Sequence, residues 1–130
     1  MASIFSKIVA GDIPAYKVAE SNEFLAFLDI APLAEGHLLV IPKKEVDNLF
    51  DLDDETYTGL MIFTKIVATA MKKAITCNRI GVTVIGLDVP HAHIHLIPIN
   101  GGNDMSFTRP KLQFTPEEFE AIAEKIKEAL

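Results

Sequence analysis

The chain has 130 residues, of which 49% are hydrophobic and 23% are charged, a composition typical of one ordered globular domain. Its formal net charge of −6 argues against a broad basic surface for nucleic acid. The single cysteine, Cys77, excludes an internal disulfide and a cysteine-rich zinc site. Residues 1–7 lack a basic, apolar leader, and no apolar run approaches the roughly 18 residues of a membrane helix. We therefore expect a cytoplasmic protein with a single domain over residues 1–130 and no membrane association.

The first third of the chain predicts one short helix and three strands. Ser3 can cap the helix and Gly11 can end it, since serine accepts hydrogen bonds from a first turn and glycine adopts left-handed backbone angles. Ser21 and Asn22 separate two apolar runs at hairpin spacing, and the second run is apolar on both faces, so we expect it to be covered on both sides. The expected elements are a helix at residues 3–10 and strands at residues 16–20, 23–29 and 37–41.

The rest of the chain predicts a long helix, two strands and a C-terminal helix. Asp53 or Asp54 can cap the long helix, and Thr115 with Glu118 forms a capping box that opens the last one. The expected elements are a helix at residues 53–76, strands at residues 80–85 and 91–97, and a helix that follows Thr115. Strands and helices do not alternate as regular β-α-β units, so we expect an α+β fold with an antiparallel sheet of about five strands.

Three of the four histidines alternate with apolar residues in one segment. On a strand, His91, His93 and His95 share one face, and the residues between them anchor the other face in the core. This pattern allows three interpretations. The imidazoles can serve catalysis, they can bind zinc, or they can form a satisfied polar patch. Strand spacing opposes zinc, because positions two apart are separated by about 6–7 Å at their backbones.

The segment His91-Ala92-His93-Ile94-His95-Leu96-Ile97 resembles the motif His-φ-His-φ-His-φ-φ of the histidine triad (HIT) superfamily, where φ is apolar. Four earlier segments are similar to the N-terminal segments of its Hint-like branch: residues 4–8, 13–15, 27–32 and 36–44. The resemblance extends over roughly residues 3–98. It implies a HIT-like fold, with one long central helix and a C-terminal helix on an antiparallel sheet.

The resemblance also implies nucleotide chemistry at an α-phosphate. By position, His93 attacks the phosphorus and forms a covalent nucleotidyl-histidine, which water hydrolyses. The backbone carbonyl of His91 accepts the inner proton of His93 and leaves its outer lone pair free. His95 is expected to hydrogen-bond the phosphate oxygens, and His37 to help position the central imidazole. No metal and no cofactor is required in this scheme.

The nucleotide-binding residues are also carried over by position. Asp29 is expected to accept hydrogen bonds from the ribose hydroxyls, although an aspartate before a loop can instead cap a turn. Apolar positions are expected to line the pocket of a purine base, although each alone is equally compatible with core packing. These positions are Ile4, Phe5, Ile8, Phe27, Ile30 and Leu39. The Hint-like branch further implies a homodimer that pairs through the long helix and a sheet edge.

The approach to the triad departs from the family pattern. Leu87 stands where a glutamine is common, and Asp88 stands where a serine-like donor is common. Because the usual residues bind the phosphate and the departing group, Leu87 and Asp88 mark the leaving-group region. Glu45 replaces the usual histidine after Pro-Lys-Lys.

We interpret the chain as a metal-independent HIT hydrolase or transferase of purine nucleotides. The expected substrates carry a labile group on the α-phosphate of a nucleoside monophosphate, as phosphoramidates and acyl adenylates do. One alternative is a dinucleoside polyphosphate hydrolase that uses the same His93. Another is a module that binds nucleotides or a partner with little catalysis. The third is a zinc protein.

Overall fold

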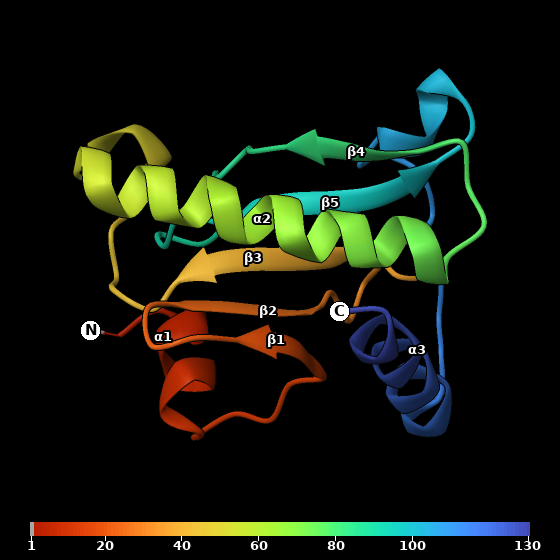
Figure 1. Cartoon of the computed structure of the whole chain (residues 1–130), viewed down its shortest axis with the longest axis horizontal. Coiled ribbons are helices and arrows are strands. Elements are labelled where there is room, and N and C mark those ends of the chain that lie inside the picture. The colour runs from red at the N-terminus through yellow and green to blue at the C-terminus, as the bar shows by residue number, and fades with distance from the viewer. Residues whose placement is uncertain (1) are drawn as a thin grey trace.

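The computed structural model describes residues 2–130, and within them the chain forms three α-helices, two 3-10 helices and one sheet (Figure 1). The strands are β1 (Lys17–Glu20), β2 (Phe24–Leu28), β3 (Leu38–Pro42), β4 (Arg79–Thr83) and β5 (Ile94–Ile99). The helices are α1 (Ile4–Ala10), α2 (Asp54–Ala74) and α3 (Pro116–Glu128), with 3-10 turns at Leu49–Asp51 and Gly102–Met105. The strand order is β1-β2-β3-β5-β4, and every neighbouring pair is antiparallel. The expected α+β class and five-stranded antiparallel sheet are confirmed.

The helix ends follow the capping signals in the sequence. Ser3 accepts a hydrogen bond from the Ser6 N–H at the start of α1, and Gly11 ends this helix with a φ of 84°. Asp53 caps α2 through the Thr56 N–H. Thr115 and Glu118 form the capping box that begins α3. No helix of residues 2–130 is both long enough and apolar enough to cross a membrane.

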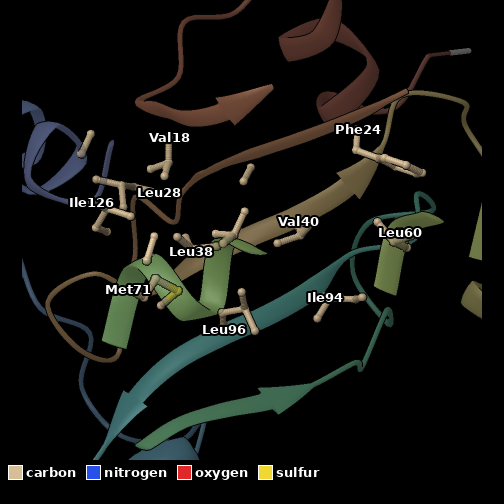
Figure 2. Packing of buried hydrophobic residues seen from close by; sticks show 14 of the residues in the cluster. Val18, Phe24, Leu28, Leu38, Val40, Leu60, Met71, Ile94, Leu96 and Ile126 are labelled. Atoms are coloured by element: carbon tan, nitrogen blue, oxygen red, sulfur yellow. The ribbon is translucent and has the colours of Figure 1, made fainter. Parts of the chain in front are cut away.

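The main hydrophobic core lies between one face of the sheet and the helices α2 and α3 (Figure 2). Alternate residues of the central strands point into it, and α2 contributes Leu60, Val67 and Met71. The labelled sheet residues in Figure 2 are Val18, Phe24, Leu28, Leu38, Val40, Ile94 and Leu96. All of β2 is buried, which confirms that this strand is covered on both sides.

A second, smaller core lies on the opposite face of the sheet. Phe5 and Ile8 of α1 pack there against the remaining residues of β2 and β3, which are Leu25, Phe27, Leu39 and Ile41. The short helix α1 therefore covers the face that α2 leaves open. In the register of the sheet, Leu39 pairs with Phe27 on one side and with His95 on the other. The small core and His95 thus share one face.

The strands β4 and β5 differ from their expected bounds. The strand expected at residues 91–97 begins only at Ile94, because the Ala92 N–H donates to Val46 in the loop after β3 instead of to a strand. This strand also runs through Pro98, which we expected to end it. Beyond Leu96, β5 has a neighbour on the β4 side alone, and proline is tolerated in such an edge position. The strand β4 ends at Thr83, two residues earlier than expected.

Candidate active site

Four histidines converge on the sheet face that carries α1. His95 lies in β5, His93 precedes this strand, and His37 directly precedes β3. All four side chains are buried, with relative exposures of 1% for His37, 0% for His91 and 7% for both His93 and His95. The rings of His93 and His95 meet edge to face with centroids 5.1 Å apart. A strand-end histidine from β3 is therefore brought to the triad, as the resemblance implies.

His37 and His95 form a hydrogen-bonded pair whose proton positions can be assigned. The Leu33 N–H donates to Nδ1 of His37 at 3.0 Å, so this ring carries its proton on Nε2. That Nε2 lies 3.0 Å from Nδ1 of His95, which accepts the proton's hydrogen bond. His95 then carries its own proton on Nε2, where the N–H remains available to a ligand. Burial lowers the pKa of His37 to about 3 and that of His95 to about 4, so both rings are neutral near pH 7.

His93 is held by a backbone carbonyl. Its Nδ1 lies 2.7 Å from the carbonyl oxygen of His91, and this acceptor requires a proton on Nδ1. The neutral form of His93 therefore keeps its lone pair on Nε2. No hydrogen bond within residues 2–130 engages that nitrogen. The geometry gives His93 an unshared pair beside the N–H of His95.

The ring of His91 has a different role from the one that strand spacing predicts. His91 lies outside β5, and its ring is enclosed between α1 and the end of β3. Its Nε2 lies 2.7 Å from the carbonyl oxygen of Pro42, and its Nδ1 lies 2.8 Å from the hydroxyl of Ser3. Both ring nitrogens are thus occupied by the protein, and His91 can act on a ligand only through its backbone. Burial lowers its pKa as well.

Asp29 lies at the end of β2, close to the histidine pair. Its Oδ1 accepts a hydrogen bond from the Ala31 N–H at 2.9 Å, which is the turn-capping contact of an aspartate before a loop. Its Oδ2 lies 3.6 Å from Nε2 of His37 and makes no hydrogen bond within the described chain. Burial raises the pKa of this carboxyl group. One oxygen of Asp29 caps the turn and the other remains free to accept hydrogen bonds. Turn capping and binding of ribose hydroxyls are therefore compatible interpretations of this residue.

The apolar positions expected at the base pocket divide into two groups. Phe5, Ile8, Phe27 and Leu39 are buried together in the small core. The Phe5 ring stands edge-on to the rings of His93 and Phe27, with centroid distances of 5.0 Å and 5.5 Å. This core therefore adjoins the histidines directly. Ile4 and Ile30 lie outside the small core, with relative exposures of 50% and 75%.

The segment expected to form the leaving-group region lies in an exposed loop. Leu87 has a relative exposure of 88%, and Asp88 is also exposed. Gly86 begins this turn with a φ of 73°, a left-handed conformation that glycine adopts without strain. The Asp88 carboxyl group makes no side-chain hydrogen bond or ion pair within residues 2–130.

Two further side chains near the histidines carried no signal in the sequence. The ring of Phe107, in the segment before α3, stands edge-on to the rings of His95 and His37, with centroid distances of 4.8 Å and 6.1 Å. Lys111 donates to the Phe107 carbonyl oxygen, and its charge contributes to lowering the pKa of His37. Both lie beyond residue 98, where the resemblance ends. A phenylalanine and a lysine in an irregular segment have no spacing that points to a site.

Asp29, His37 and His95 bring three potential metal-ligand atoms within 4.8 Å of one another. An imidazole nitrogen binds a metal through its lone pair. The Leu33 N–H occupies the lone pair of His37 on Nδ1 and leaves a proton on the Nε2 that faces the cluster. To bind a cation here, His37 has to lose the hydrogen bond from Leu33. In this arrangement the proton on Nε2 of His37 faces Nδ1 of His95.

Comparison with protein families, with known sequences and with solved structures agrees with this architecture. The family model described as HIT domain matches residues 10–102. The chain is 39% identical to adenosine 5'-monophosphoramidase hnt1 of Schizosaccharomyces pombe, over 97% of this chain and 96% of that protein. It is 43% identical to adenosine 5'-monophosphoramidase HNT1 of Saccharomyces cerevisiae, over 75% of this chain and 62% of that protein. A Hit-like protein of Bartonella henselae matches with a TM-score of 0.87 at 36% identity, over 98% of this chain and 96% of that one.

A five-stranded antiparallel sheet that buries a triad of alternating histidines beside β3 defines a histidine triad protein. The family model spans well over half of the chain, and close relatives cover nearly all of it. The chain belongs to the HIT family.

Proposed function

We propose that this protein is a metal-independent hydrolase or transferase that removes a group from the α-phosphate of a purine nucleoside monophosphate. Its substrates are phosphoramidates and acyl or aminoacyl adenylates. The observation that carries the proposal is the contrast between His93 and His95, which present a lone pair and an N–H side by side. An attack on a phosphate needs a nucleophile and a donor in this arrangement. Two relatives named adenosine 5'-monophosphoramidase support the substrate class.

The reaction has two steps. Nε2 of His93 attacks the α-phosphorus, the bond to the leaving group breaks, and the leaving group takes up a proton from solvent. Water then attacks the nucleotidyl-histidine and gives a proton back to solvent, the bond from phosphorus to His93 breaks, and the nucleoside monophosphate is released with Nε2 of His93 again unprotonated. The His95 N–H stabilises the charge on the phosphate oxygens in both steps, and the His91 carbonyl stabilises the proton on Nδ1 of His93. The scheme uses no metal and no other cofactor, and the proton on Nε2 of His37 supports it to the extent that this nitrogen is not free to bind a metal.

The nucleotide is bound by the surroundings of the histidines. The free Oδ2 of Asp29 accepts from the ribose hydroxyls. The aromatic rings of the small core border the base, which they contact by area and not by hydrogen bonds. The exposed loop at Leu87 and Asp88 borders the leaving group. Because this loop is exposed to solvent, it also leaves room for the larger leaving group of a dinucleoside polyphosphate, whose hydrolysis is the alternative function.

We further propose that two copies of the chain pair through α2 and β4. The outward face of α2 carries the exposed apolar residues Met61, Ile62 and Ile66, and β4 carries Val82. The strand β4 is an edge of the sheet, with unpaired backbone groups that a second copy can approach. An isologous dimer covers both features at once.

The experiment that tests the function compares the wild type with His93→Ala on adenosine phosphoramidate in the presence of a chelator. We expect turnover by the wild type and a loss of roughly 10³-fold or more in the variant, because the nucleophile is gone. Nucleotide binding, measured by calorimetry with AMP, is expected to change little. Comparable turnover in the variant would contradict the mechanism, and turnover of diadenosine polyphosphate alone would favour the alternative substrate class.

A further inference from the structure

A network of side-chain hydrogen bonds lies around the ring of His91, a ring that takes no direct part in the proposed reaction. It consists of Ser3, Ser6, Glu45 and His91, and we call it the Glu45 network. Oε1 of Glu45 accepts a hydrogen bond from the Ser3 N–H at 2.6 Å and another from the Ser6 hydroxyl at 2.6 Å. The loop after β3, the start of α1 and the segment before β5 are thereby joined at one point.

The direction of each proton in this network follows from its partners. The Ser6 hydroxyl gives its proton to Glu45, and the Ser6 N–H donates to the Oγ of Ser3 at 3.0 Å. The Pro42 carbonyl can only accept, so Nε2 of His91, 2.7 Å away, carries the proton. Nδ1 of the neutral ring is therefore an acceptor, and the Ser3 hydroxyl donates to it at 2.8 Å, with the Ser6 oxygen at 3.4 Å.

The network ends at the peptide group that controls His93. The ring of His91 is held at both nitrogens, and the next residue donates its N–H to Val46, the neighbour of Glu45, at 2.7 Å. The carbonyl between these two fixed points accepts the Nδ1 proton of His93 at 2.7 Å. A shift of this peptide group alters the acceptor that selects the tautomer of His93.

We propose that Glu45 is a positioning residue, which holds the Ser3 hydroxyl against His91 so that the His91 carbonyl keeps the lone pair of His93 on Nε2. The proposal rests on the proposed function, in which His93 is the nucleophile. Among residues 2–130, Glu45 forms no hydrogen bond or ion pair with His93, and it acts through Ser3 and His91. It is also the position at which this chain departs from the usual histidine of the family.

The chemistry of Glu45 suits this role. A carboxylate oxygen can accept from a backbone N–H and a hydroxyl together, and such charge-assisted hydrogen bonds are short. The hydrogen bond from the Ser3 N–H, followed by that from Ser6, lowers the pKa of Glu45 to about 2. Glu45 is consequently ionised at neutral pH, and the network keeps one protonation state there.

The test compares Glu45→Ala and Glu45→Gln with Glu120→Ala, which removes an exposed carboxylate of α3 that has no hydrogen bond or ion pair within residues 2–130. Turnover of adenosine phosphoramidate is measured together with the histidine tautomers, which long-range ¹H–¹⁵N NMR reports without any substrate. We expect Glu45→Ala to lower kcat about tenfold with KM nearly unchanged, because only the orientation of the nucleophile is lost. The His93 signals are expected to change from one tautomer to a mixture.

Glu45→Gln keeps an oxygen that can accept from both donors, so we expect it to restore kcat to within about threefold of the wild type. Ser3→Ala removes the next member of the network, and a double variant with Glu45→Ala is expected to lose no more than the worse single variant. Thermal unfolding checks that each variant folds. If Glu45→Ala does not fold, Ser3→Ala and Glu45→Gln decide by the same two readouts.

An unchanged His93 tautomer in folded Glu45→Ala or Ser3→Ala overturns the inference, even if kcat falls. Unchanged kcat together with a changed tautomer also overturns it, because the tautomer then does not limit the reaction. If the wild type does not hydrolyse the phosphoramidate, the proposed function fails, and the tautomer measurement still decides what Glu45 holds in place.

Discussion

At the scale of single residues, one backbone N–H determines how the buried histidine pair works. Leu33 donates to His37, which sends the proton of His37 toward His95 and the proton of His95 outward. In His37→Ala, nothing donates to Nδ1 of His95, so the two tautomers of His95 become comparable and its outward N–H is partly lost. We expect kcat for adenosine phosphoramidate to fall roughly 10²-fold, with the Kd for AMP within about threefold of the wild type.

The matched control is His37→Gln. A glutamine amide has an oxygen that accepts from the Leu33 N–H and an NH₂ group that donates to His95. Steady-state kinetics of the two variants separates the loss of the donor from the loss of the ring. If both variants lose activity equally, the imidazole of His37 does more than donate a hydrogen bond. The relay, by which we mean the hydrogen bonds from Leu33 to His37 and from His37 to His95, then does not explain its role.

The sequence predicts these residues unequally. His91, His93 and His95 stand out because polar residues alternate with apolar ones, and this regularity is visible without a structure. His37 and Asp29 are ordinary strand-end residues by themselves, and only the family resemblance singles them out. The partners of the His91 ring, which are Ser3, Ser6 and Pro42, lie at least 49 positions away along the chain, and no local pattern encodes such a contact.

At the scale of helices and strands, capping residues and hydrophobic periodicity predict the elements well. Asp53, Thr115 and Gly11 mark helix ends that the structure confirms. The error at the start of β5 has a tertiary cause, because the segment from His91 to His93 hydrogen-bonds to the loop after β3 and to its own turn. Histidine alternation continues in the sequence where the strand does not, so the period of two overstates the length of β5.

The outward faces of α2 and β4 carry the prediction that belongs to this scale. Ile62 and Ile66 have relative exposures of 57% and 55%, and Val82 on the adjoining edge strand has 53%. Light scattering at micromolar concentration is expected to give about twice the chain mass of 14.3 kDa. Ile66→Glu buries a charge in the proposed interface, and we expect it to elute at the monomer mass.

Phe50→Glu is the matched control for this interface. Phe50 is more exposed, at 84%, and lies in the 3-10 turn before α2 instead of on the apolar face of the helix. The same substitution there should leave the mass unchanged. A monomeric wild type, or dissociation by both variants, contradicts the pairing through α2 and β4.

At the scale of the whole molecule, the histidine site couples stability to pH. Burial is the first cause that lowers the pKa of His37, His91 and His95 alike. In the unfolded chain these side chains bind protons as the pH falls through about 6.5, while burial moves their protonation in the folded chain to lower pH. The unfolded state therefore holds more protons below this pH, and the free energy of unfolding falls with the pH. The free energy of unfolding has its full value, as far as these histidines affect it, above about pH 6.5. It falls progressively toward about pH 4, where His95 takes up its proton in the folded protein.

His37, His91 and His95 each contribute a slope of up to about 1.4 kcal/mol per pH unit between the unfolded and folded pKa values of that histidine. Urea unfolding at about pH 7, pH 6 and pH 5 measures this slope in a range above the ordinary pKa of carboxyl groups. Asp29, whose pKa burial raises, acts in the opposite direction, since the folded chain takes up its proton first. His37→Gln removes one of the three histidines, so we expect its slope to be shallower by about one proton. An unfolding free energy that stays level or rises from pH 7 to pH 5 would show that these rings take up protons in the folded protein, and the neutral relay from His37 to His95 would then be excluded.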